Sequence, residues 1–415
     1  MTSVEAVTER RRAAADVSAA VLLGVALVAS QWSDLTAARW TLRLLPVWAV
    51  LLIMTLPAQA RGRLRVPLAL TAFLGWCLAS HAWSADPGNS TRRLVDLVAL
   101  IFVGWLTGQV LGAHGALITL ARTVRYVLLV CAASLIVAPH WATAPGSDGA
   151  PGWHGPFPHK NGLGFFCAFA ILTLWVAMPS GWRRRLWLGL VLILLVGSRS
   201  ASPLAALAAA TVLMVWQAAR SRGSVRRRLA VDSAASGFLG VVGSVLLLWP
   251  DAFFAALGRD SSLTGRRAVW TAVEHWIGKR PLTGFGFGGV WEDPAPVTLA
   301  LWRESQFDVF YAHNGYLDIE LQVGLIGLVL LVAVLVGLVI AATRPGQPAG
   351  QWPLGVLVLL LLTAVSESAP FTGNGLLLLA LLVGCLGAPV AELRRPPAGE
   401  VPSARSVPAV AVATP

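Results

Sequence analysis

Charged residues are scarce in this sequence. Asp, Glu, Lys and Arg make up 13% of the 415 residues, whereas 56% are hydrophobic and the mean hydropathy is +0.70. A soluble domain typically carries about 25% charged residues. The composition therefore argues against a soluble protein and indicates that lipid is the main solvent.

Lysine is almost absent, and it occurs only at Lys160 and Lys279. The formal net charge of +12 therefore comes from arginine. A charge of this size could indicate a nucleic-acid partner, but most of the arginines lie in short segments between apolar runs. Arginine at such positions sets the orientation of membrane helices, so we expect no nucleic-acid partner.

Motifs for metals and cofactors are also missing. The four cysteines all fall in apolar segments with no metal-ligand or disulfide spacing, so we expect them to be small core residues. The sequence has no Asp-x-Asp pair, no P-loop, no nucleophile elbow and no Cys/His cluster. Acidic residues inside apolar segments are few, chiefly Asp96 and Glu367. We therefore expect chemistry without a metal ion or cofactor.

Long apolar runs are what the sequence has in abundance. Runs of roughly 17 to 25 residues recur along nearly the whole chain, which is the length that crosses a hydrocarbon core. They are continuous rather than alternating, so they predict helices and not barrel strands. The sequence predicts an all-α polytopic membrane protein of about 12 transmembrane helices, with one long extracytoplasmic loop that contains short helices. The predicted spans are 13–30, 40–57, 66–82, 94–111, 124–139, 161–178, 183–198, 201–218, 229–250, 316–342, 353–369 and 375–391.

The basic loops predict the orientation of these helices. Most of the arginines fall on one side if both termini are cytoplasmic, as the positive-inside rule requires for a bacterial inner membrane. The expected organisation is a cytoplasmic segment 1–12, nine helices within 13–250, an extracytoplasmic loop 251–315, three helices within 316–391 and a disordered tail 392–415.

The loop 251–315 is much longer than the other connections, and long loops in compact structures are often functional. It is rich in aromatic residues, which favours a folded segment over a disordered one. The stretch 264–278, TGRRAVWTAVEHWIG, has helical periodicity. We expect it to form a short helix along the membrane interface.

Three arginines are candidates for anion binding. Arg199 stands between Ser198 and Ser200 where two apolar helices meet, and it could be an interfacial anchor or part of a site. Arg266 and Arg267 follow a glycine at the predicted start of the loop helix. A helix N-terminus suits phosphate, and guanidinium groups add donors, although a solvated basic pair is an equally ordinary arrangement.

Two histidine motifs flank predicted helices. His313 and Asn314 precede the helix at 316, where the histidine could act as a general base or merely cap the helix. Asp318 and Glu320 could orient His313 or stabilise the helix start.

The second motif, FPHKNGLG, places His159, Lys160 and Asn161 at the entry to the span 161–178. Lysine there could bind phosphate or anchor the helix. The run GFGFGG at 284–289 has no preceding strand, so it predicts a tight turn rather than a nucleotide loop.

Taken in order, these motifs resemble those of the O-antigen ligase and polymerase superfamily of bacterial membrane glycosyltransferases. The resemblance covers about residues 60–390. It is carried by HKNGLG at 159–164, GSRSA at 197–201, LTGRRAVW at 263–270, LTGFGFGG at 282–289 and HNGYLDIELQVGLIG at 313–327.

The resemblance implies transfer of a glycan from an undecaprenyl-pyrophosphate donor to a glycan or glycolipid acceptor at the outer face of the membrane. It implies that Arg199 and Arg266, with Arg267 as an alternative to the latter, hold the pyrophosphate, and that His313 is the base that activates the acceptor. Whether the chain is a ligase or a polymerase stays open. A lipid-linked sugar flippase is the alternative from another class, and a structural membrane scaffold is a third.

Overall fold

The structure is a computed structural model, and it describes residues 3–31, 36–56, 58–143, 151–221, 266–291, 295–344 and 349–387, with positions 224, 226, 229 and 233 between them. The described residues form helices and turns, with no strand among them. The predicted span 229–250 lies almost entirely outside the described residues, as do the loop residues 251–265 and the tail 392–415.

The other predicted spans each coincide with one or more helices. In chain order these are α1 (Ser3–Gln31), α2 (Thr36–Thr55), α3 (Ala58–Arg61), α4 (Leu68–Ala79), η1 (Ser80–Trp83), α5 (Pro87–Val137), α6 (Pro139–Ala142), α7 (Lys160–Ala177), α8 (Trp182–Ser198), α9 (Ala201–Ser221), α12 (Arg266–Lys279), α13 (Pro296–Ser305), α14 (Gly315–Ala342), α15 (Trp352–Ala364), η2 (Ala369–Phe371) and α16 (Gly373–Leu386).

Four of the described helices are long and apolar enough to cross a membrane by themselves: α5, α7, α9 and α14. Five shorter apolar helices accompany them. On α14, Val329, Val332, Val336 and Ile340 are exposed at helical spacing, which is the stripe expected of a lipid-facing helix. The all-helical prediction is therefore confirmed for the described residues, and the number of twelve spans stays a prediction.

The longest helix, α5, contains two of the predicted spans. At Gly112 the backbone takes φ 64° and ψ 176°, a left-handed conformation that glycine adopts without strain. Both ends of α5 meet the segment 151–159, since Asn89 lines a cavity with Phe157, and Ser134 lies beside Gly155. The chain therefore doubles back at Gly112, and the two halves of α5 run in opposite directions.

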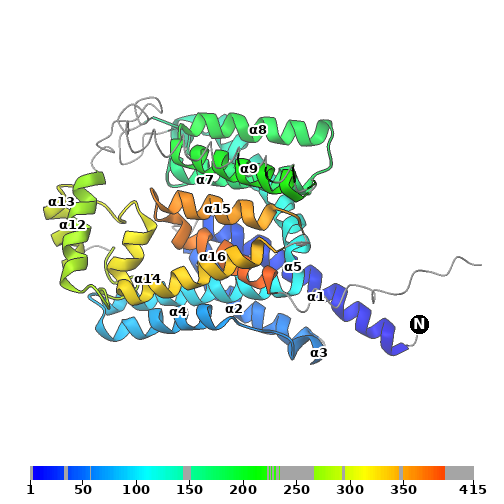
Figure 1. Cartoon of the computed structure of the whole chain (residues 1–415), viewed down its shortest axis with the longest axis horizontal. Helices are drawn as coiled ribbons and strands as arrows, with labels where there is room; N and C mark the ends of the chain where they lie inside the picture. The colour runs from blue at the N-terminus through cyan, green and yellow to red at the C-terminus, as the bar shows by residue number, and fades with distance from the viewer. Residues whose placement is uncertain are drawn as a thin grey trace, which may run out of the picture.

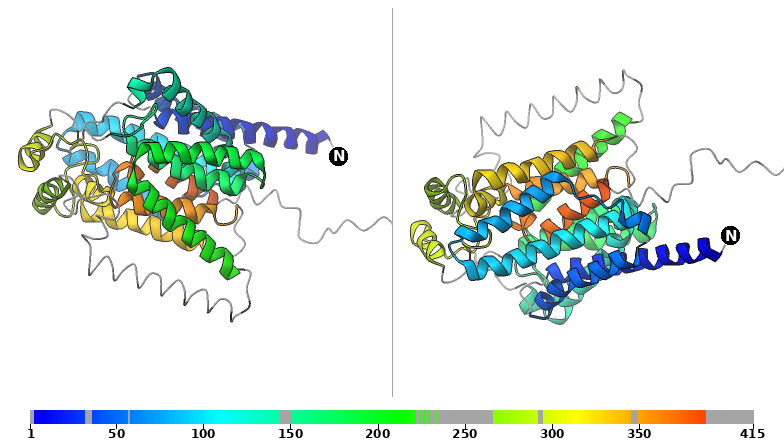
Figure 2. Two further views of the ribbon diagram at one scale, coloured as in Figure 1. Left: turned by 90° about the horizontal axis from the view of Figure 1, so that it is seen from above. Right: turned by 90° about the horizontal axis from the view of Figure 1, so that it is seen from below.

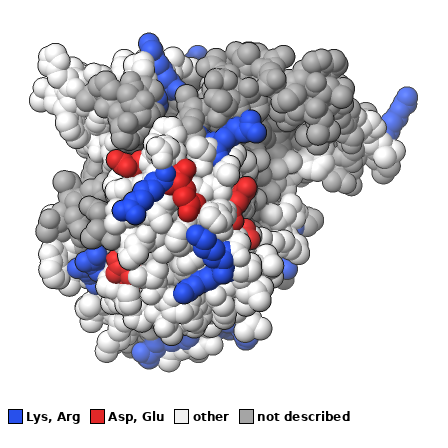
Figure 3. All heavy atoms as spheres, turned by 90° about the vertical axis from the view of Figure 1, so that its left-hand side faces the viewer, with Lys and Arg blue, Asp and Glu red and all other residues white. Residues whose placement is uncertain are grey.

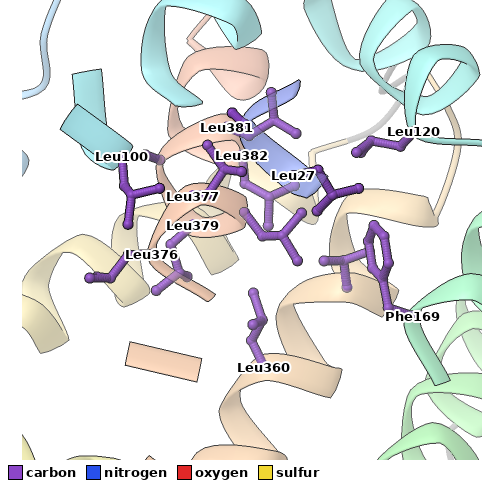
Figure 4. Packing of buried hydrophobic residues seen from close by; sticks show 14 of the residues in the cluster. Leu27, Leu100, Leu120, Phe169, Leu360, Leu376, Leu377, Leu379, Leu381 and Leu382 are labelled. Carbon is purple, nitrogen blue, oxygen red and sulfur yellow. The ribbon is translucent and has the colours of Figure 1, made fainter. Parts of the chain in front are cut away.

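Close packing of α5 on α16 forms the centre of the bundle. A Cβ atom on Gly108 would lie 2.4 Å from the Leu381 carbonyl oxygen, and one on Gly104 would lie 2.5 Å from that of Leu377. This Gly-x-x-x-Gly spacing lets two helix backbones approach closely, as it does in membrane helices. Leucines of α16, including Leu377, Leu381 and Leu382, fill the surrounding core (Figure 4).

The stretch 264–278, which the sequence predicts to be helical, forms α12 from Arg266 onward, and α13 follows it. The two helices pack against each other at the end of the bundle opposite the N-terminus (Figures 1 and 2). Figure 3 shows this end face on, with basic and acidic side chains interspersed over it. A mixed-charge end next to apolar flanks is what a membrane protein presents to water.

The four cysteines are buried and free, as the sequence predicts.

Candidate active site

The site is built around Glu367, in the short connection between α15 and η2. Arg266, the first residue of α12, places its Nη2 atom 2.9 Å from Glu367 Oε1, and its Nη1 donates to the Ser366 carbonyl oxygen at 2.6 Å. The Arg266 side chain is 13% exposed, whereas Arg267 is exposed. Of the two adjacent arginines, Arg266 is therefore the one that enters the site.

His313 reaches the same carboxylate from the other side. Its Nδ1 lies 3.8 Å from Glu367 Oε2, slightly beyond hydrogen-bond length, and the side chain is 24% exposed. Tyr311 packs edge-on against the imidazole, with the ring centroids 4.6 Å apart. A small rotation of either side chain would close the contact, and catalytic hydrogen bonds are often long before substrate binds.

The backbone at His313 is unusual. Its φ is 52°, in the left-handed region that a residue with a side chain rarely adopts. Asn314, next in the chain, caps α14 by accepting from the backbone N–H groups of Tyr316 and Leu317. Strained backbone of this kind collects at functional sites, where the surrounding structure holds it in place. Asn314 thus fixes the helix start, and His313 is turned out of the helix toward Glu367.

A hydrogen-bonded chain joins Glu367 to the two other motifs. Asn161 Nδ2 donates to Glu367 Oε1 at 2.7 Å, and Ser200 Oγ donates to Asn161 Oδ1 at 2.8 Å. Ser202 and Ser366 are also hydrogen-bonded through their hydroxyls. The motifs at 159–164 and 197–201 therefore reach the site through Asn161 and Ser200.

The ionisation of Glu367 follows from its neighbours. Burial by itself raises the pKa of this carboxyl, but the nearby His313 and Arg266 lower it more, and the net pKa lies below the ordinary glutamate value. Glu367 is therefore a carboxylate at neutral pH. A buried carboxylate beside an imidazole can hold the ring in one orientation and stabilise its protonated form.

Arg199 does not join this cluster. It ends α8 with a left-handed backbone, φ 51°, and its side chain is exposed. Within the described part of the chain, its guanidinium makes no hydrogen bond or ion pair. It lines a separate hollow of about 640 Å³ together with Trp153, Leu192, Ile193 and Val196. Of the three candidates, the structure therefore brings Arg266 and His313 together at Glu367 and leaves Arg199 in a separate hollow.

The remaining candidates divide between helix capping and the site. His159 caps α7, accepting at Nδ1 from the Asn161 backbone N–H at 3.3 Å, and Lys160 is the first residue of that helix. The suggestion that Asp318 orients His313 is wrong, because α14 directs this buried carboxylate toward Trp291 and Gln322. The residue beside the imidazole is Glu367, whose role sequence reasoning missed.

The run at 284–289 forms the predicted turn. Its glycines at 284, 286 and 288 have positive φ, and the turn packs between the start of α5 and α14. Ser90 donates to the Phe287 carbonyl oxygen, and Gln322 accepts from the Gly288 N–H at 2.7 Å. The turn therefore forms part of the wall of a cavity of about 410 Å³, which Glu367 and Asn161 also line.

Comparison with known proteins finds similarity over a segment that carries some of these residues. The family described as O-antigen ligase matches residues 186–332, a segment that includes Arg199, Arg266 and His313. The exopolysaccharide production protein ExoQ of Rhizobium meliloti (strain 1021) is 26% identical over 282 residues. That alignment covers 65% of this chain and 63% of the relative, so the chain spans less than two thirds of the relative's length. The apolar helices indicate an integral membrane protein, and over residues 186–332 the chain is similar to the family described as O-antigen ligase.

Proposed function

We propose that this chain is a glycosyltransferase that moves glycan from an undecaprenyl-pyrophosphate carrier to an acceptor hydroxyl at the outer face of the bacterial inner membrane. Both termini are cytoplasmic in this proposal, and the reaction uses no metal ion. The observation that supports it is the meeting of Arg266 and His313 on one buried carboxylate. This places a cation and a candidate base side by side at the end of the bundle that carries the water-facing helices α12 and α13.

The reaction is a single displacement at the anomeric carbon of the donor. The imidazole of His313 takes the proton of the acceptor hydroxyl, and the oxygen forms a bond to the anomeric carbon. The bond from that carbon to the pyrophosphate oxygen breaks, and its electron pair leaves with the diphosphate. The anomeric configuration is inverted. General base catalysis of this kind contributes roughly 10² to 10⁴ in rate.

Glu367 and Arg266 assist at opposite stages of this step. With the Nδ1 proton directed at Glu367, the Nε2 atom of His313 is the one that receives the acceptor's proton. Glu367 then stabilises the imidazolium ion that forms, as the carboxylate of a catalytic triad does. Arg266 neutralises charge on the departing diphosphate, and fixed donors of this type are worth several kcal/mol in a site shielded from water.

Arg199 has a separate part in the proposal. Its hollow has an apolar wall of Leu192, Ile193 and Val196 and one exposed guanidinium. An apolar surface beside a cation suits the polyprenyl end and the lipid-proximal phosphate of the carrier, because one side binds hydrocarbon and the other binds an anion. We assign Arg199 to the carrier rather than to the reacting sugar.

Polymerisation is the version of this function that we favour over ligation. The similar Rhizobium meliloti protein is named for exopolysaccharide production. Incubation of the purified protein with lipid-linked repeat units alone separates the two: a polymerase lengthens the glycan, whereas a pure ligase needs a different acceptor. Transfer should persist in EDTA, and its loss on chelation would contradict the metal-free mechanism.

Arg266→Lys tests the site, with Arg267→Lys as its matched control. Lysine keeps the charge but cannot reach both the Ser366 carbonyl oxygen and the Glu367 carboxylate in the planar geometry of a guanidinium. We expect transfer to fall by about tenfold or more in Arg266→Lys, for the loss of one charge-assisted hydrogen bond, and to stay near wild type in Arg267→Lys. Equal activity of the two variants would remove Arg266 from the reaction.

A further inference from the structure

The cavity next to Glu367 has the size and position of a small-molecule site. Its volume is about 410 Å³, and its walls come from five segments: the N-terminal parts of α5, α7 and α14, the turn at 284–289, and the end of α15 with its connection to α16. Ligand sites typically measure roughly 300 to 1,000 Å³. The five segments meet at the same end of the bundle as the active-site cluster, and Glu367 belongs to both.

The charges of the lining exclude an anion as the preferred ligand. Three carboxylates line the cavity, those of Asp96, Asp318 and Glu367, against a single guanidinium from Arg93, and the carboxylates of the lining outnumber its guanidinium even with Glu367 paired to Arg266. A diphosphate would meet more negative than positive charge here, and like charges repel strongly in a site shielded from water. The cavity therefore differs from the Arg266 side of Glu367 and fits an uncharged polar ligand.

Aromatic walls accompany these polar groups. Phe157, Trp291 and Tyr311 line the cavity together with the amides of Asn161 and Gln322. The Trp291 indole is held in place by a hydrogen bond to Asp318, so its ring is a fixed surface. A sugar ring has C–H faces that pack on aromatic rings and hydroxyls that bond to amides and carboxylates, and this lining offers both.

The lining contains the buried hydroxyl of Thr363, which has no partner among the described residues. Thr363, on α15, is 1% exposed, and its Oγ1 atom makes no hydrogen bond to any described residue. A threonine inside a helix usually bonds its hydroxyl to a backbone carbonyl one turn earlier, as Thr107 does with the Val103 carbonyl oxygen. An unpaired buried hydroxyl is unfavourable, so its place in the wall of a polar cavity indicates that a ligand supplies the missing bond.

We propose that this cavity binds one uncharged sugar residue of the glycan substrate, with the Thr363 hydroxyl bonded to a sugar hydroxyl. The inference rests on the proposed function for the identity of the substrate. Beyond that function, it gives the position of one sugar residue next to Glu367, and it predicts that the cavity binds neutral sugars more tightly than acidic ones.

The first test compares neutral and acidic probes. Methyl glycosides of glucose, galactose, mannose and N-acetylglucosamine, and methyl glucuronide as the anionic counterpart of the glucoside, are titrated into the purified full chain and followed by saturation-transfer NMR. We expect at least one neutral glycoside to bind and the glucuronide to bind about tenfold more weakly, with Asp318→Asn narrowing that gap. Absence of binding by every neutral glycoside, or equal binding of the glucuronide, overturns the proposal.

The second test replaces the unpaired hydroxyl. Thr363→Val keeps the shape of the side chain and breaks no hydrogen bond within the described chain, so its melting temperature should stay at or above that of wild type. Glycoside binding should weaken by about three- to tenfold, which corresponds to the loss of one hydrogen bond. Thr107→Val is the matched control: it is equally buried, loses a real hydrogen bond and does not line the cavity, so it should be less stable and bind normally.

The outcomes separate this inference from the proposed function. Unchanged glycoside affinity in Thr363→Val overturns the sugar site even if the protein transfers glycan. Binding that depends on Thr363, in a protein that neither lengthens nor transfers lipid-linked glycan, leaves the sugar site standing and overturns the transferase.

Discussion

Among the described residues, two histidine–glutamate pairs lie at the end of the bundle that carries α12 and α13. His275 Nδ1 is 2.9 Å from Glu304 Oε2, and this pair joins α12 to α13 with side chains 59% and 35% exposed. His313 Nδ1 is 3.8 Å from Glu367 Oε2, with side chains 24% and 9% exposed. The tighter contact is thus the one in water, and the looser contact is the buried one.

The neighbours of each pair explain this difference. Glu304 also accepts from the Trp276 indole at 3.0 Å, and Lys279 lies over the Trp276 ring, so all the surrounding groups serve to hold α13 on α12. Glu367 is shared by Arg266 and Asn161, which occupy its Oε1 atom and leave Oε2 facing His313. In the buried pair, the Nδ1 atom of His313 therefore faces the open Oε2 atom of Glu367 but makes no hydrogen bond within the described chain.

The largest difference between the pairs should appear when each histidine is removed. His313→Ala should lower the rate of glycan transfer by about 10² to 10⁴, the range for loss of a general base. His275→Ala, the matched control, should leave transfer near the wild-type rate. The rates are measured with lipid-linked donor under saturating conditions, and wild-type activity of His313→Ala would reduce the buried pair to a structural contact.

Removal of the Glu367 carboxylate should have the next largest effect. Glu367→Gln keeps the size of the side chain but leaves the half-buried Arg266 without its counter-charge, and breaking a buried pair in this way costs about 3 to 5 kcal/mol. We expect a clear fall in the detergent-solubilised melting temperature as well as lost transfer. A variant as stable as wild type would show that water or another group already screens Arg266.

The role of Glu367 marks the limit of the sequence-based predictions. The positions of the described helices, the helix at 266–279 and the choice of Arg266 and His313 as candidates follow from apolar run length, periodicity and motif order. Glu367 follows from none of these, since it lies 101 residues from Arg266 along the chain and meets it only through packing of α15 against α14. The available signal was an acidic residue between two serines at the end of an apolar run, which is costly near lipid and marks a site by default.

The placement of Asp318 and Arg199 away from His313 could not be read from the sequence for a similar reason. Asp318 is close to His313 in sequence, but the helical rotation of α14 carries its side chain into the cavity wall. Arg199 is adjacent to Ser200, which joins the Asn161 chain, yet the left-handed turn at Arg199 directs its own side chain into another hollow. Neighbours along the chain thus face different sites wherever a turn or helix separates them, and motif order does not encode that rotation.

Acid should reduce the contribution of Glu367 to the stability of the folded chain. The pKa of Glu367 is lower in the folded chain than in the unfolded one, so its contribution to the free energy of unfolding is fully present above the ordinary glutamate pKa and disappears as the pH falls through the folded value. The difference in melting temperature between wild type and Glu367→Gln should therefore be largest near neutral pH and shrink on acidification. A difference that grows as the pH falls would contradict the ionised state of Glu367.

The smallest effect belongs to the exposed pair. The pKa of Glu304 is also lowered: burial raises it, but the hydrogen bonds from His275 and Trp276 and the nearby charges of His275 and Lys279 together outweigh that effect. Solvent screens this contact, and exposed pairs are typically worth about 0.2 to 1 kcal/mol. Glu304→Gln should therefore shift the melting temperature little, and the shift should vanish at about 1 M salt, where the screening length is about 3 Å. The melting-temperature shift of Glu367→Gln should persist at the same salt concentration, because the Arg266 contact is shielded from solvent. Equal salt sensitivity of the two variants would contradict the difference between an exposed and a buried pair.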